Sequence, residues 1–391
     1  MTFKSIVGTA LCIALMLLLG GCGGGTASTE TSTSSTLSAT AALGKKIFFD
    51  QSLSASGQQA CGTCHDPDHA FAGTEVVPAG GPNMDQSGTR NTPTLLYLRY
   101  NTAFFFDNEG TPTGGFFLDG RTNSFAEQAR APFLNPSEMA NASAAEVASR
   151  LASASYVNEF TRIFGADIFD DPEKVLDHAT FAIAQYEKEA PEFAPFTSKF
   201  DYFLKGKVSL TAQELRGFAL FNNPLKGNCA GCHVDTPLAD GTPPLFTDFT
   251  YDNLGVPRNP AIPANADPDY FDLGLCGPQR LTLAGRTDLC GAFKVPTLRN
   301  IALTAPYFHN GVFSTLQEVV TFYVTRETNP ELWYPNGGAD KFNDLPSQYH
   351  KNVNTTEVPY NRKPGDQPAL TSDEIDDVVA FLNTLTDGYQ P

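Results

Sequence analysis

The chain has 391 residues, of which 41% are hydrophobic, and its formal net charge is −17. This length and apolar content allow a sizeable core and ordinarily produce two domains. The acidic balance argues against nucleic acid and anionic lipid surfaces as partners. It favours a basic protein partner that is steered by charge, although solubility alone accounts for the charge equally well.

The N-terminus is typical of an exported protein. The apolar run Ile6–Leu19 follows a positive charge and is shorter than the roughly 20 apolar residues that a membrane span needs. Leu19-Gly20-Gly21-Cys22 is similar to the bacterial lipobox, whose cysteine is lipidated and becomes the mature N-terminus. We therefore predict a lipoprotein signal peptide over 1–21 and a flexible Gly/Ser/Thr tether over 22–40. The predicted location is the periplasm or outer membrane of a Gram-negative bacterium, with the lipid as the only membrane link.

Two copies of one short motif carry the chemistry. Cys61-Gly62-Thr63-Cys64-His65 is repeated as Cys229-Ala230-Gly231-Cys232-His233. In Cys-x-x-Cys-His, two thiols bond the vinyl groups of a c-type haem and the histidine reaches the iron. The alternative is a pair of disulfides, zinc sites or redox sites that happen to precede histidine, and two such coincidences in one chain are rare. We predict two covalent haem c groups, attached through these cysteines and ligated by His65 and His233.

Cys276 and Cys290 are the two cysteines left over once the signal, the lipid and the haems have taken the others. Export to an oxidising compartment favours a disulfide between them. Two free buried thiols are the alternative.

A helix is predicted ahead of each motif, over 43–50 and over 211–221. Gly44 and Gly217 each stand four residues before a phenylalanine of these helices. A small residue beside an aromatic one on the same helix face lets a second helix approach closely, which is how the terminal helices cross in cytochrome c folds.

Two further helices are predicted to complete the halves. Asp171-Pro172-Glu173 opens one, and the capping box Thr371-Ser372-Asp373-Glu374 opens the other. The Pro- and Gly-rich stretch 234–291 is predicted to be a long loop. We therefore predict a mainly α protein with long loops and two cytochrome c-like helical domains, 41–200 and 201–391, each enclosing one haem.

A repeat supports the two halves. Pro93-Thr94-Leu95 recurs as Pro296-Thr297-Leu298, and Phe104-Phe105 matches Tyr307-Phe308 at the same offset. Internal duplication is the simplest account of this repeat.

From about residue 41 to the end, the chain resembles the bacterial dihaem cytochrome c peroxidase and MauG family. Besides the two haem motifs, four strings carry the resemblance: Arg90-Asn91-Thr92-Pro93-Thr94, Asp119-Gly120-Arg121, Asn135-Pro136-Ser137-Glu138-Met139 and Val295-Pro296-Thr297-Leu298-Arg299-Asn300. The resemblance implies an oxidoreductase in which the N-terminal haem meets H2O2 and the C-terminal haem relays electrons.

The resemblance also implies roles for single residues near the first haem. His65 would be the proximal ligand of the peroxide-reacting haem, and Gln128 and Glu138 match the distal-pocket pair of the family. A carboxylate there can take a proton from H2O2 and return it to the leaving oxygen. Without the family, Glu138 would be a turn residue and Gln128 an exposed helix residue.

At the second haem, His233 would be the proximal ligand and Tyr323 the other axial ligand. Peroxidases that draw electrons from small cytochromes usually have methionine at this position, whereas MauG has tyrosine. An anionic phenolate stabilises oxidised iron. The alternative is a core tyrosine on an amphipathic helix. The family also binds Ca²⁺ between the haems, through groups that match Asn91, Thr304 and Pro306.

Three functions are therefore compared. A MauG-like enzyme would oxidise an aromatic residue, tryptophan, of a partner protein. A cytochrome c peroxidase would reduce H2O2 to water with electrons from a small cytochrome or cupredoxin. A non-catalytic dihaem electron-transfer cytochrome is the third. Tyr323 favours the first, while Leu118 departs from the family, which has tryptophan there as an electron bridge. The family's distal histidine also has no match: an open first haem is expected, with Met84 as an alternative ligand.

Overall fold

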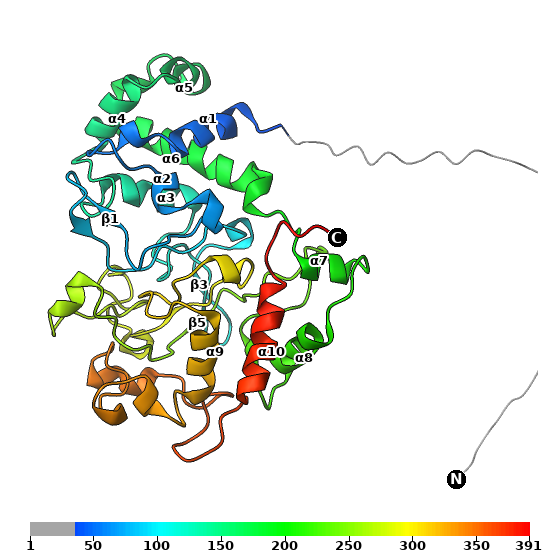
Figure 1. Ribbon diagram of the computed structural model, residues 1–391. Coiled ribbons are helices and arrows are strands. Elements are labelled where there is room, and N and C mark those ends of the chain that lie inside the picture. Colours follow the sequence, from blue (N-terminus) through cyan, green and yellow to red (C-terminus); the bar gives the residue numbers. More distant parts are fainter. Residues whose placement is uncertain (1–35) are drawn as a thin grey trace, which may run out of the picture. The chain divides into compact units, whose positions relative to one another are not determined.

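A computed structural model of the protein describes residues 36–391 (Figure 1). The predicted signal peptide, the predicted lipidation site Cys22 and most of the predicted tether lie outside the described residues. Within 36–391, none of the helices combines the length and the apolar character that crossing a membrane requires.

The described residues are mainly helical, as predicted, with long irregular connections and three short hairpins. The helices are α1 Ala39–Phe48, α2 Cys61–Cys64, α3 Phe125–Leu134, α4 Ala144–Ala152, α5 Val157–Phe164, α6 Pro172–Glu189, α7 Lys199–Leu204, α8 Ala212–Asn222, α9 Leu316–Thr325 and α10 Ser372–Asn383. The strands pair antiparallel as β1 Ala79–Gly80 with β2 Gln86–Ser87, β3 Phe105–Phe106 with β4 Pro112–Thr113, and β5 Tyr251–Asp252 with β6 Phe293–Lys294.

Two helix pairs cross at the predicted glycines. α1 lies against α6, and α8 lies against α10 (Figure 1). A Cβ on Gly44 would stand 1.9 Å from the carbonyl oxygen of Ala182 in α6, and a Cβ on Gly217 would stand 1.9 Å from that of Asp377 in α10. Glycine is therefore required at both crossings, because the backbones touch where a side chain would be.

The helix starts follow from capping. The Asp171 side chain accepts hydrogen bonds from the first turn of α6, and Thr371 forms a capping box with Glu374 at the start of α10. α1 begins at Ala39, four residues before the predicted start and inside the stretch assigned to the tether. The reason is Ser38, whose hydroxyl accepts a hydrogen bond from Ala41 N and whose own N–H and O–H both donate to the Glu189 carboxylate.

The apolar side chains gather mainly in two cores. The first contains α1, α3 to α6 and Phe193, and the second contains Phe200, α8, α9 and α10. Leu245, from the long loop, joins the first core. Along the chain, core membership changes between Phe193 and Phe200. The assignment of separate domains to 41–200 and 201–391 stays a prediction.

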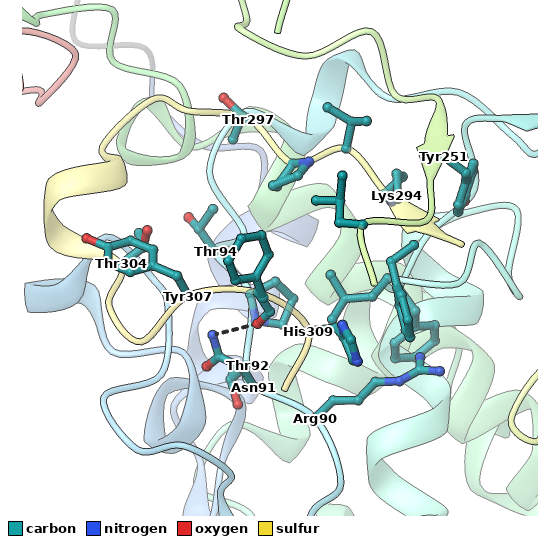
Figure 2. A pocket seen from close by; sticks show the side chains of 18 of the residues that line it. Arg90, Asn91, Thr92, Thr94, Tyr251, Lys294, Thr297, Thr304, Tyr307 and His309 are labelled. Atoms are coloured by element: carbon teal, nitrogen blue, oxygen red, sulfur yellow. Dashed lines mark hydrogen bonds between the residues drawn. The ribbon is translucent and has the colours of Figure 1, made fainter. Parts of the chain in front are cut away.

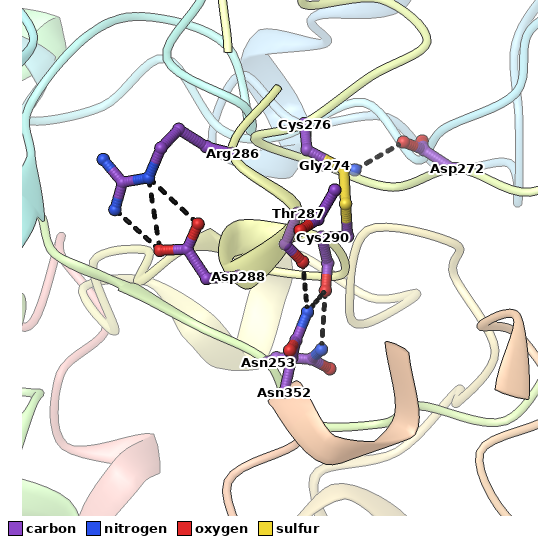
Figure 3. Close-up of a disulfide and its surroundings, with 9 residues drawn as sticks. All are labelled: Asn253, Asp272, Gly274, Cys276, Arg286, Thr287, Asp288, Cys290 and Asn352. Carbon is purple, nitrogen blue, oxygen red and sulfur yellow. Dashed lines mark hydrogen bonds and ion pairs between the residues drawn. A yellow bond between two sulfur atoms is a disulfide. The ribbon is translucent and has the colours of Figure 1, made fainter. Parts of the chain in front are cut away.

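The stretch 234–291 forms a long loop with little regular structure, as predicted. Cys276 and Cys290, the pair that the cysteine count singles out, form a disulfide inside it (Figure 3). The side-chain amides of Asn253 and Asn352 both donate to the Cys290 carbonyl, at 3.1 and 3.2 Å. Asn352 thereby attaches the loop to the chain that follows it, whereas the Asn253 contact holds two parts of the loop together.

Candidate haem centres and active site

Both Cys-x-x-Cys-His motifs line one cavity of about 1350 Å³. This volume exceeds the roughly 300–1,000 Å³ of ordinary single-ligand sites. Gln128, Glu138 and Tyr323 line the same cavity. The structure thus brings together the residues that the sequence analysis assigns to the two haems.

The first motif forms α2, and His65 follows it with its N–H bonded to the Cys61 carbonyl at 2.9 Å. The His65 Nδ1 lies 3.0 Å from the Phe71 carbonyl oxygen. A carbonyl can only accept, so Nδ1 carries the proton and Nε2 keeps its lone pair for a metal. Burial lowers the pKa of His65 to about 4, so the ring is neutral at ordinary pH. A neutral imidazole with one oriented N–H is what an iron ligand requires.

The second motif repeats this arrangement. The His233 Nδ1 lies 3.0 Å from the Phe246 carbonyl oxygen, and burial again lowers the pKa of the ring. Thr94 and Thr297, which the sequence repeat pairs, support the two carbonyl segments. The Thr94 hydroxyl donates to the Ala70 carbonyl, and the Thr297 hydroxyl donates to the Leu245 carbonyl, both at 2.6 Å. Ala70 and Leu245 directly precede Phe71 and Phe246, whose carbonyls accept from the histidines. The internal repeat therefore preserves the second layer of contacts around both histidines.

The four motif cysteines are not joined in disulfides. Burial raises the pKa of all four thiols, to about 11 for Cys64 and about 12 for Cys229 and Cys232. Among residues 36–391, no group of three or more His, Cys, Asp or Glu side chains is arranged to hold a metal ion. The disulfide and zinc alternatives therefore lack support, and the residues present fit covalent attachment of haem.

Glu138 lies in the turn that follows α3, and Gln128 lies within α3; both face the cavity. The Glu138 carboxylate accepts a hydrogen bond from Asn135 Nδ2 at 2.7 Å. Burial raises the pKa of Glu138, against the opposing effects of the Asn135 hydrogen bond and the Arg121 charge. Glu138 is near enough to the first motif for its charge to raise the pKa of Cys64, after burial the second cause of that shift. A half-buried carboxyl with a raised pKa is suited to moving protons at this site.

Tyr323 lies on α9 and lines the cavity near the second motif. Its ring centroid is 5.8 Å from that of Phe308 and 5.9 Å from that of Tyr360. Burial raises the pKa of the phenol, and the nearby Asp252 carboxylate raises it further. In the absence of a cation the hydroxyl therefore keeps its proton, and coordination to iron would have to displace that proton.

Comparison with known proteins agrees with this geometry. The family pattern described as Di-haem cytochrome c peroxidase matches residues 38–209. Methylamine utilization protein MauG of Paracoccus denitrificans is 36% identical over 371 residues, which cover 90% of each chain. The chain belongs to the dihaem cytochrome c peroxidase and MauG family. Cytochrome c551 peroxidase of Nitrosomonas europaea is 32% identical over 90% of this chain and 80% of its own.

A solved structure supports the same assignment. The dihaem peroxidase BthA from Burkholderia thailandensis has a TM-score of 0.83 and 42% identity, over 89% of this chain and 86% of its own. The protein is thus a dihaem oxidoreductase that uses H2O2, with cytochrome c-like helical domains and two c-type haems.

The predicted calcium ligands Asn91, Thr304 and Pro306 all line the cavity, and Figure 2 shows Asn91 and Thr304 on its wall. The Asn91 Nδ2 lies 2.5 Å from the Pro306 carbonyl oxygen and 3.5 Å from that of Phe308, while Asn91 Oδ1 is buried without a partner. A half-turn of the amide would aim Oδ1 at these two carbonyls. The result would be a cluster of neutral oxygens, together with the Thr304 region, of the kind that Ca²⁺ takes with added waters. The residues present fit a calcium ion.

Several residues that the sequence left open are now placed. Leu118 lines the cavity, whereas Trp333 does not: it packs on Phe313 and Phe322. Met84 is not among the residues that line the cavity, so the structure gives no support to it as a ligand of the first haem. The histidines without an assigned role lie elsewhere, with His69 beside Asp66, His178 stacked on Phe164, and His350 bonded to Leu345.

The sequence analysis assigned no role to several ionisable residues of the cavity wall, among them His309, Lys294 and Glu187. His309 stacks on Phe293 with centroids 3.7 Å apart. Glu187 on α6 is buried, which raises its pKa to about 8, and one of its oxygens has no partner. Lys294 directly precedes one of the strings that carry the family resemblance, and His309 directly follows the repeated pair Tyr307-Phe308. Glu187 gave no signal, because its helix face otherwise shows only the apolar pattern of a core.

Proposed function

We propose that this enzyme reacts with H2O2 at the N-terminal haem and, like MauG, oxidises an aromatic residue, tryptophan, of a partner protein. The observation that supports the proposal is Tyr323, which faces the part of the cavity next to the second motif. The haem irons supply peroxide binding and electron transfer. The contribution of the protein chain is to hold the irons, move protons and set their potentials.

Glu138 is proposed as the acid–base residue of the first site and Gln128 as its neighbour in positioning peroxide. An ionised Glu138 takes a proton from H2O2, and the resulting carboxylic acid returns it to the oxygen that leaves as water. Asn135, which donates to the carboxylate, fixes its orientation. Glu138 is half-buried and lines the cavity, so its carboxylate can reach a molecule held there.

We propose that Tyr323 would hold the iron of the C-terminal haem together with His233. A phenolate is anionic and stabilises oxidised over reduced iron, whereas a methionine thioether does the reverse. This choice suits a haem that stores oxidising equivalents for a protein substrate better than one that accepts electrons at high potential.

Calcium is proposed to bind Asn91 Oδ1 and the carbonyls of Thr304 and Pro306. Its role would be to fix the wall between the two motif sites. We further propose that the enzyme is periplasmic or, through a lipid on Cys22, attached to the outer membrane. Its acidic charge would steer a basic face of the partner protein toward it.

The experiment that tests this function is the substitution Tyr323→Met. We expect the potential of the second haem to rise and its ferric low-spin spectrum to change, because a neutral ligand replaces an anion. Tyr334→Met is the matched control, since Tyr334 is a buried tyrosine that donates to Gly255 O and does not line the cavity. If Tyr323→Met leaves the potential and spectrum of the second haem unchanged, Tyr323 is a core residue and the MauG-like proposal loses its support.

The second candidate is cytochrome c peroxidase, favoured by the similarity to the Nitrosomonas europaea enzyme. One equivalent of H2O2 added to the diferric protein separates the two. Rapid return of the spectrum with a small cytochrome or cupredoxin supports the peroxidase, whereas a long-lived oxidised state that decays with a tryptophan-bearing protein supports the MauG-like reaction. An electron-transfer cytochrome would show two six-coordinate haems and no high-spin ferric signal.

A further inference from the structure

Four basic side chains gather around Asp119 at the wall of the shared cavity. They are Arg90, Arg121, Arg280 and Lys294, and all but Arg280 line the cavity itself. Asp119 is completely buried. Figure 2 shows Arg90 and Lys294 on this wall, together with His309 and Tyr251. The reactions proposed above assign no role to these cations.

The contacts of Asp119 are direct. Its carboxylate accepts from Arg90 Nη1 at 2.8 Å and from Arg121 Nη1 at 2.9 Å, and its backbone carbonyl accepts from Arg280 Nη1 at 2.8 Å. Lys294 Nζ donates to the Gly115 carbonyl at 2.6 Å and has no carboxylate in contact. Asp119 is the carboxylate whose charge acts on Lys294. Asp119 therefore interacts with all four basic side chains.

A second carboxylate does not balance the group. Asp272 accepts from Arg90 Nε at 2.5 Å and from Arg90 Nη2 at 2.7 Å, so its charge is paired with that of Arg90. Asp344 does not contribute to the group either, because it lies 3.5 Å from Arg258, which balances its charge, and 3.4 Å from His309. Four positive charges thus face two negative ones, and two remain without a partner.

Glu138 is the remaining carboxyl that acts on this group, through Arg121. Burial raises its pKa, which disfavours its charged form. Even with Glu138 ionised, the four basic side chains would outnumber the carboxylates around them by one.

An uncompensated cation away from water is costly, and the cost appears at Lys294, whose pKa burial lowers to about 7. Arg121 also has hydrogen-bond donors to spare. It donates to Asp119 through Nη1 and its backbone N–H, and its guanidinium lies 3.4 Å from the centroid of the Phe117 ring. Its remaining N–H groups have no partner within residues 36–391. Both side chains can therefore accept an anion from the cavity.

We propose that Lys294 and Arg121 bind propionate carboxylates of the haems and thereby complete the charge balance around Asp119. A carboxylate suits both: the arginine fork offers it directional N–H donors and the lysine a compact charge. This inference rests on the two haems of the family and not on the choice between the MauG-like and peroxidase reactions. A cation at a propionate favours the reduced haem, because reduction adds a negative charge to the group.

The test is potentiometry of the loaded enzyme with Lys294→Met, Lys294→Arg and, as control, Lys199→Met. Lys199 is also partly buried but pairs with Glu214 and does not line the cavity. In Lys294→Met we expect the ferrous-to-ferric ratio of one haem at fixed applied potential to fall at least tenfold, which is a shift of about 59 mV for one electron. Lys294→Arg should restore most of the ratio, and Lys199→Met should leave it unchanged.

Unchanged potentials of both haems in Lys294→Met would overturn the proposal. If that variant fails to hold two haems, resonance Raman of the wild-type enzyme decides, because propionate bending modes shift in D2O when the carboxylate accepts from exchangeable N–H groups. No shift at either haem would refute the inference. These are equilibrium properties, so they would stand or fall independently of the reaction with H2O2.

Discussion

Glu138→Gln removes one proton-transfer group and little else. Glutamine keeps the length of the side chain and can still contact Asn135, so the fold and haem content should stay intact. Loss of a positioned acid–base group typically costs about 10²–10⁴ in rate. We expect the second-order rate constant with H2O2 to fall by about 10² or more, which at 1.36 kcal/mol per tenfold is about 2.7 kcal/mol of transition-state stabilisation.

The direction of the raised pKa also fixes the pH dependence. Only the carboxylate can accept the peroxide proton, so the wild-type rate should rise as pH increases through the pKa of folded Glu138, which lies above 4.5. The stability of the protein changes with pH in the opposite direction to the rate. A carboxyl whose pKa is raised on folding stabilises the protein below its unfolded pKa, and this contribution is lost as pH rises through the folded pKa. Glu138→Gln should therefore remove the pH step in rate without destabilising the protein at neutral pH.

Stopped-flow mixing of the diferric enzyme with H2O2, from pH 4.5 to 9, measures both effects. Glu75→Gln is the control, because Glu75 is exposed and does not line the cavity. If the rate constant and its pH profile are the same in Glu138→Gln as in the wild type, Glu138 has no part in the proton transfer.

Three other substitutions test the fold and the haem attachment. Gly217→Ala would place a methyl group 1.9 Å from an α10 carbonyl oxygen, so the free energy of unfolding measured with denaturant should fall by about 1–3 kcal/mol or more. Gly285→Ala is the control, because a Cβ there would have nothing within 4 Å, and it should change the free energy of unfolding by less than about 0.5 kcal/mol. Arg299→Met leaves Asp201 charged, unpaired and buried, and should cost about 3–5 kcal/mol in the same assay; a loss below about 1 kcal/mol would contradict this. Cys232→Ala should prevent normal attachment at the second site and leave one covalent haem in the denatured mass spectrum, and two would disprove the attachment motif.

The sequence predicted what depends on local chemistry or on a short repeat. The capping residues Asp171 and Thr371 marked helix starts, because a side chain that satisfies free backbone N–H groups needs only its own turn. Gly44 and Gly217 marked the helix crossings, because close backbone approach excludes every side chain. The error at the start of α1 came from a tertiary contact: Glu189, about 150 residues away, binds Ser38 and extends the helix backward.

What the sequence did not predict depends on groups that meet only in the folded chain. The carbonyl oxygens of Phe71 and Phe246 orient the two histidines. Every residue has a backbone carbonyl, so the sequence does not indicate which of them a histidine will contact. The charge imbalance around Asp119 has the same origin. Its partner Arg280 comes from the disulfide loop, about 160 residues away in the chain, so only a fold can show that four cations share one aspartate.

The contacts across the cavity wall bear on how the two centres are coupled without a tryptophan at position 118. The Asn91 N–H donates to the His309 carbonyl at 2.8 Å, Arg90 bridges Asp119 and Asp272, and the Tyr97 hydroxyl donates to Asp387 at 2.6 Å. Each contact joins the chain before residue 200 to the chain after it or braces such a junction. Leu118 therefore sits in a wall held in place by ionic and hydrogen-bonded contacts from both halves. Leu118 itself takes part, because its carbonyl accepts from the Lys294 N–H at 2.9 Å, so position 118 is tied directly to the second half of the chain although it carries no aromatic ring.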